Sequence, residues 1–285
     1  MQGILVINKR QGITSHDCIY ILRDLLGIKK IGHSGTLDPM ATGVLPMTIG
    51  KATRVSSFIQ DSEKEYIATI EFGIETDTED ITGNIINRSD KIPTKEEILE
   101  ILPKFTGVIE QTPPMYSAVR LGGRKLYKIA REGKVVDRPK RKVKIYGLEL
   151  LGTNPYKVKI NCSSGTYVRT LISDIGKSLG TFATMTSLVR TKVGPFTVEK
   201  AITIDDLENM TKEEIEEKFY PTEFALRNMP RYNVPKSFFE RLINGVKFFD
   251  DRMEDGKYSV YCRDEFIGIG EFIDGRLRIK VLRWR

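Results

Sequence analysis

The amino-acid sequence predicts a mixed α/β body, of the α+β class, with a largely antiparallel central sheet and a small β-rich appendage at the C-terminal end. Several segments alternate apolar and polar residues with period two, which is typical of half-buried strands. Other segments carry apolar residues at helical spacing behind a threonine cap. From about residue 231 the pattern changes to short alternating runs. At 285 residues the chain is long enough for one large domain or for a main domain with a small appendage.

Charge and composition limit the function classes. The net charge of +7 and the isoelectric point of about 9.1 favour a polyanionic partner. The three cysteines lie far apart and the two histidines are His16 and His33, so we expect neither a disulfide framework nor a metal site. The sequence has no apolar run of about 18 residues and no signal-peptide pattern at its start. We therefore expect a cytoplasmic protein outside the membrane.

The first half of the chain combines strands with capped helices. Residues 3–8 predict a buried strand, and a capping box of Thr14 and Asp17 predicts the start of a helix. Residues 66–73 alternate and predict a half-buried strand, in which Tyr66 by itself would indicate only core or edge packing. The segment 75–83 has four acids in six residues at a spacing that no EF-hand loop uses. We expect it to be a solvated acidic connector.

Later elements follow from the same signals. A capping box of Thr94 and Glu97 predicts a helix over 94–104, and residues 143–151 and 156–162 predict paired strands. The remaining predicted elements are a helix from the turn at 163–171 to Leu179, capped helices after Thr203 and Thr211, a helix over 235–244, and strands at 258–262, 266–272 and 277–282.

Residues 120–144 concentrate positive charge. They hold eleven Lys or Arg and two acids, a local net charge of 11 − 2 = +9. Apolar residues within the stretch predict a short amphipathic helix or hairpin with a basic face. A solvated charged face is the simpler explanation, but a concentrated basic element on a nearly neutral body is typical of phosphate contacts. The C-terminal residues Arg276, Arg278, Lys280, Arg283, Trp284 and Arg285 likewise predict cations around a stacking platform.

Residues 32–45 are the strongest candidate for chemistry. Asp38 lies on a turn stiffened by Pro39, with three glycines and His33 close by in the sequence. In isolation an Asp-Pro turn usually bonds nearby backbone N–H groups. The chain has neither a glycine-rich phosphate-binding loop nor a Ser-His-Asp arrangement. A carboxylate acting on nucleic acid without metal indicates chemistry at a base or a glycosidic bond.

Arg169 is the second candidate, because it falls in the first turn of a predicted helix, where a cation opposes the helix dipole. This unfavourable placement suggests a paired carboxylate, although a surface arginine is an equal alternative. Leu188 on its own would indicate only a core position.

The motif Gly-His-x-Gly-Thr-Leu-Asp-Pro-x-Ala-x-Gly-x-Leu over residues 32–45 resembles the signature of the TruB family, the tRNA pseudouridine-55 synthases. The acidic stretch at 76–83 and Tyr-x-Arg-Thr at 167–170 are also similar to that family. Two departures are Arg10, where proline is usual, and Thr181-Phe182-Ala183, where a Cys-Gly-Ala-like turn is common. The resemblance implies a pseudouridine-synthase fold. It implies a catalytic domain at 1–230 with an RNA-gripping insertion at about 111–144, and a PUA-like module at 231–285.

The resemblance also implies roles for individual residues. Asp38 would be the essential aspartate, and Arg169 would pair with it and favour its charged form. Tyr66 would stack on the flipped uracil and assist removal of the C5 proton. Tyr167 and Leu188 would line the base pocket, and His33 would fill the space that the uridine vacates. The residues expected to grip the RNA are Arg124, Lys125, Lys128 and Arg131.

The expected substrate is the T stem-loop of tRNA, bound by a monomer without cofactor, metal, guide RNA or protein partner. Asp38 attacks C1′ in our hypothesis, while addition to C6 of the base and a glycal route stay open. Three other functions remain at this point: an RNA-binding or chaperone protein with a decayed site, a base-excising glycosylase, and a guide-RNA-dependent pseudouridine synthase.

Overall fold

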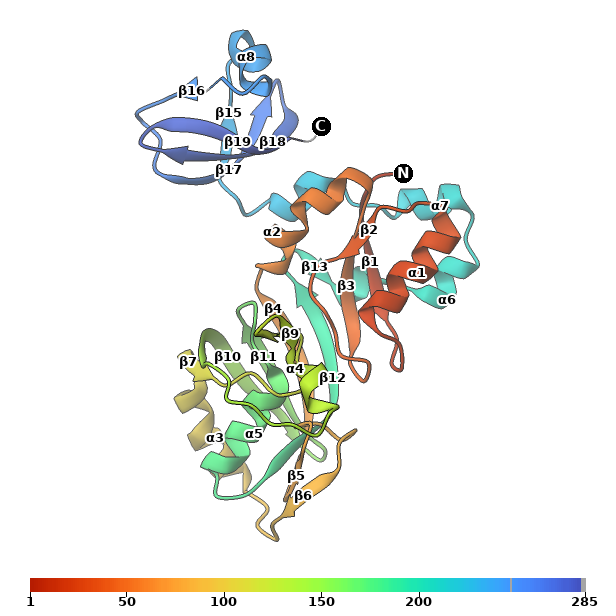
Figure 1. The fold of residues 1–285 in the computed structure, drawn as a ribbon, viewed down its shortest axis with the longest axis vertical. Coiled ribbons are helices and arrows are strands. Elements are labelled where there is room, and N and C mark those ends of the chain that lie inside the picture. Colours follow the sequence, from red (N-terminus) through yellow and green to blue (C-terminus); the bar gives the residue numbers. More distant parts are fainter. Residues whose placement is uncertain (247, 283–285) are drawn as a thin grey trace.

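The computed structural model describes residues 1–246 and 248–282. These residues form two large sheets, connected by residues 204–230, and two small two-stranded sheets (Figure 1). Within these residues the larger sheet has ten strands, in the order β14-β1-β3-β12-β4-β11-β10-β7, with β2 on β3 and β13 on β12. The strands are β1 (Gly3–Lys9), β2 (Ile31–His33), β3 (Thr42–Ile49), β4 (Lys64–Phe72), β7 (Gly107–Gln111), β10 (Arg141–Thr153), β11 (Tyr156–Cys162), β12 (Ala183–Val193), β13 (Phe196–Thr197) and β14 (Ile202–Thr203).

The predicted antiparallel character is confirmed. Among the described strands of this sheet, β1 with β14 and β3 with β12 are the parallel pairs, and each pairs only two residues. The β3–β12 pair joins two halves of the body, which lie on either side of β12 in Figure 1. One half carries β1, β2 and β3, and the other carries β4, β11 and β10. Because strands of both halves meet at β12, loops from each half reach the same region.

Helices from all parts of the body bury apolar residues in one shared core. The helices are α1 (Ser15–Leu26), α3 (Lys95–Ile101), α5 (Val168–Ser178), α6 (Ile204–Glu208) and α7 (Lys212–Glu217). The capping boxes predicted at Thr14 and Thr94 are present. The α-helix predicted over 94–104 ends at Ile101 and continues as the 3-10 turn η2 (Leu102–Phe105), because Pro103 has no N–H to continue α-helical bonding.

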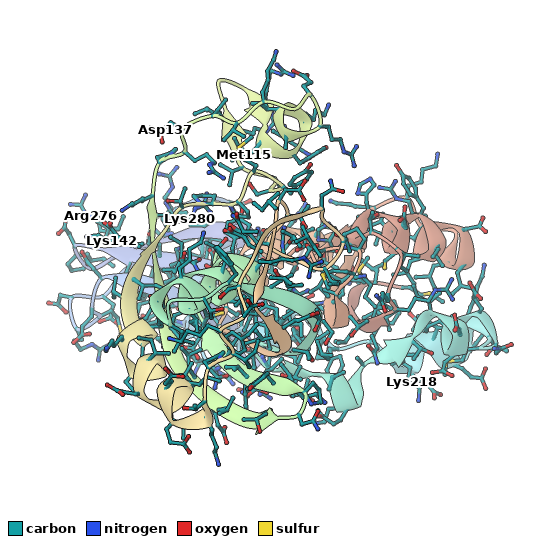
Figure 2. The ribbon with its side chains drawn as sticks, turned by 90° about the horizontal axis from the view of Figure 1, so that it is seen from below. Met115, Asp137, Lys142, Lys218, Arg276 and Lys280 are labelled. Carbon is teal, nitrogen blue, oxygen red and sulfur yellow. The ribbon has the colours of Figure 1, made fainter. Side chains whose placement is uncertain are left out.

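The basic insertion forms a small lobe that projects from the body, where Met115 and Asp137 are labelled in Figure 2. It contains both predicted forms, a hairpin of β8 (Arg120–Leu121) and β9 (Arg124–Lys125) and the helix α4 (Leu126–Ala130). Its own cluster of Met115, Leu126 and Ile129 holds the lobe together. Two further short strands, β5 (Ile74–Thr76) and β6 (Ile85–Arg88), flank the acidic segment 77–84.

The second sheet confirms the predicted β-rich C-terminal end. Its order is β15-β17-β18-β19-β16, with bounds β15 (Arg231–Asn233), β16 (Phe248–Phe249), β17 (Gly256–Cys262), β18 (Glu265–Ile273) and β19 (Arg276–Leu282). The helix predicted over 235–244 is divided into a 3-10 turn, η5 (Lys236–Phe238), and α8 (Phe239–Ile243). Arg276 and Arg278 are exposed on β19, whereas Arg283, Trp284 and Arg285 lie outside the described residues.

The two sheets share an apolar cluster. Ile4, Val44 and Phe196 of the body pack in one cluster with Leu226 of the connecting segment and with Phe266 and Ile269 of β18. The C-terminal sheet is therefore docked on the body by buried side chains. Across the described residues, no helix combines the length and apolar character needed to span a bilayer.

Gly43 occupies the tightest point of the junction between the halves. Its φ is +102°, and an added Cβ would lie 2.2 Å from the carbonyl oxygen of Arg190 on β12. We expect Gly43→Ala to lower the free energy of unfolding by about 2–5 kcal/mol, the sum of left-handed strain and overpacking. Gly107→Ala is the matched control, because Gly107 has a φ of +96° and open space around it. Denaturant unfolding should show a smaller loss, about 1–2 kcal/mol, for the control. Equal losses for both variants would contradict a steric role of the junction.

Candidate active site

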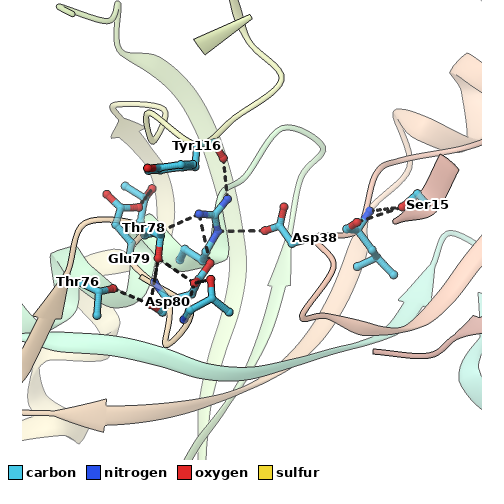
Figure 3. Close-up of polar contacts among 11 residues, drawn as sticks. Ser15, Asp38, Thr76, Thr78, Glu79, Asp80 and Tyr116 are labelled. Carbon is cyan, nitrogen blue, oxygen red and sulfur yellow. Dashed lines mark hydrogen bonds and ion pairs between the residues drawn. The ribbon is translucent and has the colours of Figure 1, made fainter. Parts of the chain in front are cut away.

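Asp38 lies on the loop between β2 and β3, and hydrogen bonds fix the residues on either side of it, Leu37 and Pro39. The Ser15 hydroxyl accepts a hydrogen bond from Leu37 N–H (2.8 Å) and donates one to Leu37 C=O (3.1 Å). On the other side, the Pro39 carbonyl accepts from Gly12 N–H (2.9 Å) and from the buried Lys9 ammonium (3.4 Å). These contacts fix the backbone around Asp38 and leave its side chain directed toward α5 (Figure 3).

Asp38 and Arg169 form an ion pair, with 3.0 Å between Oδ2 and Nε. The Arg169 side chain is 5% exposed, whereas that of Asp38 is 37% exposed. Arg169 lies in the first turn of α5 as predicted, and the carboxylate offsets the unfavourable interaction of the cation with the helix dipole. The site therefore presents a solvent-accessible carboxylate that is paired with a buried guanidinium.

The Arg169 guanidinium binds two other segments as well (Figure 3). It donates to the Thr78 carbonyl from Nη1 (2.7 Å) and to the Tyr116 carbonyl from Nη2 (2.9 Å). Asp80 supplies a second carboxylate, with Oδ2 at 3.5 Å from Nη1. One side chain thus connects the Asp38 loop, the acidic segment and the base of the basic lobe.

The prediction that residues 75–83 form a solvated connector holds for the exposed Asp77 but is wrong for Asp80. The Asp80 side chain is 7% exposed and faces Arg169. The hydroxyls of Thr78 and Thr82 donate to Asp80 Oδ1 at 2.8 and 2.5 Å, and Thr82 N–H donates to the same oxygen at 3.0 Å. Buried charge requires such partners. The alternation Thr78-x-Asp80-x-Thr82 was the sequence signal for this buried acid, although acid content alone indicated the opposite.

Tyr66 and Leu188 are buried on neighbouring strands at the centre of the sheet. Tyr66 on β4 pairs with Arg190 on β12, and Leu188 pairs with Ala68. Burial raises the pKa of the Tyr66 phenol, so the side chain is neutral near pH 7. Neither residue forms a hydrogen bond to the Asp38–Arg169 pair, and both belong to the main apolar core of the body. The charge of Asp38 contributes to the raised pKa of Tyr66.

Tyr167 immediately precedes α5, and the buried Gln111 holds its backbone. The Gln111 amide accepts from Tyr167 N–H (3.0 Å) and donates to Tyr167 C=O (3.2 Å), so β7 is tied to the start of α5. The Arg141 guanidinium lies 5.6 Å from the Tyr167 ring. The Tyr167 ring is half-buried, while its backbone position is fixed two residues before Arg169.

His33 ends β2 and is partly buried. Its Nδ1 is buried and has no hydrogen-bond partner. Burial, with smaller contributions from His16 and Arg190, lowers the pKa of His33, so its imidazole is neutral near pH 7.

Arg190 is a further residue of the site region that sequence reasoning did not find. It is fully buried and donates to Val44 C=O (2.7 Å) and Gly35 C=O (3.1 Å), on the two sides of the Asp38 loop. Burial and the charge of Arg190 lower the pKa of the neighbouring Lys64 to about 8. No local sequence pattern separates Arg190 from a surface arginine.

The four predicted RNA-gripping cations lie on the projecting lobe rather than beside Asp38. Arg124, Lys128 and Arg131 are exposed, and Lys125 is half-buried. Lys125 and Arg131 each lie 5.6 Å from the Tyr127 ring, and Arg124 pairs with Glu132. The lobe meets the Asp38–Arg169 pair through the Tyr116 carbonyl. Over the described residues, no group of three or more His, Cys, Asp or Glu is arranged to hold a metal ion.

Two family models match most of the chain, and curated relatives match nearly the whole of it. Residues 23–168 match the model of the TruB family pseudouridylate synthase N-terminal domain, and residues 169–229 match the tRNA pseudouridylate synthase B C-terminal domain. The chain is 42% identical over 281 residues to a tRNA pseudouridine synthase B of Francisella philomiragia, covering 97% of this chain and 93% of the relative. It is 43% identical over 279 residues to that of Clostridium tetani, covering 95% and 96%.

Solved structures support the fold. The crystal structure of a Cbf5-Nop10-Gar1 complex contains a chain that is 26% identical, with a TM-score of 0.73 over 95% of this chain and 78% of that one. An H/ACA RNP bound to a substrate RNA contains a chain with a TM-score of 0.75 at 23% identity, covering 99% and 85%. The predicted pseudouridine-synthase fold is confirmed. On its sequence and its fold, the chain belongs to the TruB family of pseudouridylate synthases.

Proposed function

We propose that this protein is a tRNA pseudouridine synthase that isomerises the T-loop uridine at position 55. The observation that carries the proposal is the accessible Asp38 carboxylate held by the buried Arg169, in a chain whose relatives are named tRNA pseudouridine synthase B. In this reaction the N1–C1′ bond breaks, the uracil turns, and C5 bonds to C1′ while the C5 proton is lost and N1 gains one. Substrate and product are isomers, so the reaction requires neither oxidant nor group donor.

The target uridine leaves its stack to reach Asp38, at a cost of a few kcal/mol. Tyr66 stacks on the flipped uracil and assists removal of the C5 proton, while Tyr167 and Leu188 line the base pocket. The burial of Tyr66 and Leu188 on adjacent strands supports an apolar pocket wall. His33 takes the space that the uridine leaves, and its neutral imidazole suits contact with bases.

Asp38 acts at C1′ in our proposal. A carboxylate there either bonds to the anomeric carbon or stabilises an oxocarbenium-like species while the uracil is detached. Arg169 orients the carboxylate through its Nε, and its other nitrogens are occupied by Thr78, Asp80 and Tyr116. The guanidinium thus has no freedom to turn away from Asp38.

We propose that residues 1–230 form the catalytic domain and that residues 231–285 form an RNA-binding module. The insertion at about 111–144, through Arg124, Lys125, Lys128 and Arg131, grips the T stem-loop. Cbf5 occurs in solved complexes with Nop10 and Gar1. Here the lobe supplies the RNA grip within the chain, so the protein acts as a monomer without guide RNA or protein partner.

Asp38→Asn should reduce pseudouridine formation on the order of 10⁴-fold, because the amide is neither a nucleophile nor a charge partner for C1′. The measurement is pseudouridine mapping in an unmodified tRNA transcript incubated with the protein alone. The dissociation constant for tRNA should stay within about twofold, since a single accessible side chain contributes little to phosphate binding. Asp24→Asn, an exposed substitution on α1, serves as the control. Substantial residual activity of Asp38→Asn, or release of free uracil by the wild type, would refute the proposal.

The site of covalent attack is open to a direct test. In RNA that carries 5-fluorouridine at the target position, the fluorine withdraws electron density from C5 and slows formation of the C5–C1′ bond that displaces Asp38. We therefore expect any trapped adduct to link Asp38 to C1′, with the N1–C1′ bond broken. Mass spectrometry of the digested complex locates the bond. An Asp38 ester at C6 of the base would instead support the addition route.

Replacing Arg124, Lys125, Lys128 and Arg131 by Gln should weaken tRNA binding and flatten its salt dependence. The slope of log K against log salt should fall by about 0.7–0.9 for each phosphate that the lobe no longer neutralises. The control replaces the same number of exposed lysines, Lys95, Lys104, Lys212 and Lys218, elsewhere on the body. Lys218 lies on the opposite side from the lobe in Figure 2. If both quadruple variants show the wild-type slope, the grip lies outside the lobe.

A further inference from the structure

Three consecutive residues of the acidic segment bind two consecutive residues of α5. The Thr78 carbonyl accepts from Arg169 (2.7 Å), Asp80 pairs with Arg169 (3.5 Å), and between them Glu79 accepts from the Thr170 hydroxyl, with 2.6 Å between Oγ1 and Oε2. Glu79 does not touch Arg169 through a hydrogen bond. It binds the residue next to Arg169 on a buried turn of helix, where Thr170 is 5% exposed.

The backbone of Glu79 has a conformation that non-glycine residues rarely adopt. Its φ is +64°, in the left-handed region. Such a conformation persists only where surrounding contacts impose it. Here Glu79 N–H donates to Thr76 C=O (3.2 Å), and Glu79 C=O accepts from Met185 N–H on β12 (3.3 Å). The reversal at Glu79 lets the carbonyl before it and the carboxylate after it face the same guanidinium.

The side chain of Glu79 is the remaining link between this turn and α5. Burial raises the pKa of the Glu79 carboxyl, while the Thr170 hydroxyl and the charge of Arg169 oppose that shift. The carboxyl lies in a partly buried position, where the Thr170 hydroxyl donates a hydrogen bond to it. No pattern in residues 76–83 indicated that Glu79 binds Thr170.

We propose that Glu79 is a positioning residue for Arg169: its hydrogen bond to Thr170 locks the 78–80 turn onto α5, so that the guanidinium stays directed at Asp38. The catalytic consequence rests on the proposed function, whereas the effect on Arg169 itself does not. A displacement of reacting groups by about 1 Å is enough to lower a rate by up to about 100-fold.

Steady-state kinetics on unmodified tRNA test the catalytic consequence. We expect Glu79→Ala and Thr170→Val each to lower kcat about tenfold with KM within about twofold, because the geometry of the pair changes and tRNA contacts do not. The double variant should lose no more than either single variant, since both remove one interaction. Glu79→Gln keeps a hydrogen-bond acceptor and Thr170→Ser keeps a donor, so each of these variants should retain at least about half of the wild-type kcat.

Two further variants distinguish the role of the Glu79 carboxylate from that of the left-handed backbone and from that of other contacts between this segment and α5. Glu79→Gly tolerates the left-handed backbone but lacks the carboxylate, so it should lose as much kcat as Glu79→Ala. Glu75→Ala removes a different contact between the same segment and α5, the pair with Lys177 at 3.0 Å, and should leave kcat unchanged. Wild-type kcat in Glu79→Gly, equal losses in Glu75→Ala, or additive losses in the double variant would each overturn the proposal.

A spectroscopic measurement on the free protein is independent of turnover. The Nε–H proton of Arg169, hydrogen-bonded to Asp38, should give a protected NMR signal that Arg169→Lys removes. Glu79→Ala should shift or broaden this signal, and Glu79→Gln should return it to its wild-type position. An unchanged signal in Glu79→Ala overturns the positioning role. If the wild type forms no pseudouridine but the signal responds to the variants as expected, the proposed function is overturned and the positioning role of Glu79 is not.

Discussion

The buried guanidinium of Arg169 is the constraint around which the site is built. A charge that is nearly withdrawn from water needs hydrogen bonds and opposite charge, or its burial costs more free energy than a folded domain can supply. Asp38 and Asp80 provide the charge, and the carbonyls of Thr78 and Tyr116 provide the remaining acceptors. Because these partners come from three segments, satisfying one cation also aligns the Asp38 loop, the acidic turn and the base of the lobe.

The geometry of the sheet makes this convergence possible. The short parallel contact of β3 with β12 brings the Asp38 loop of one half close to α5 of the other. Arg190 reinforces the contact from inside, since it bonds carbonyls on both sides of the loop. Gly43 permits the close approach, where a side chain would meet the backbone of Arg190. The loop is therefore rigid at its base, and the Asp38 carboxylate is partly exposed to solvent.

The two regions that we propose to hold RNA are attached differently. The basic lobe has its own small core, and the Tyr116 carbonyl at its base accepts a hydrogen bond from Arg169. A movement of the lobe on RNA binding would therefore displace one of the hydrogen-bond partners of Arg169. The C-terminal sheet instead shares an apolar cluster with β1, β3 and the segment that connects the two sheets. The C-terminal sheet is held on the body by the burial of apolar side chains, a non-directional interaction, rather than by the polar network of the site.

The sequence by itself determined the features that depend on neighbours in the chain. Capping boxes at Thr14 and Thr94, the alternation of the main strands and the exposed turn at Asp38 follow from local chemistry, and the awkward position of Arg169 in its helix indicated a carboxylate partner. Only the tertiary structure decided that Glu79 faces Thr170, that Gln111 holds Tyr167 and that Arg190 supports the loop. These contacts join residues roughly 55 to 155 positions apart. Their partners are set by the order in which strands pair in the large sheet, which the spacing of residues along the chain does not encode.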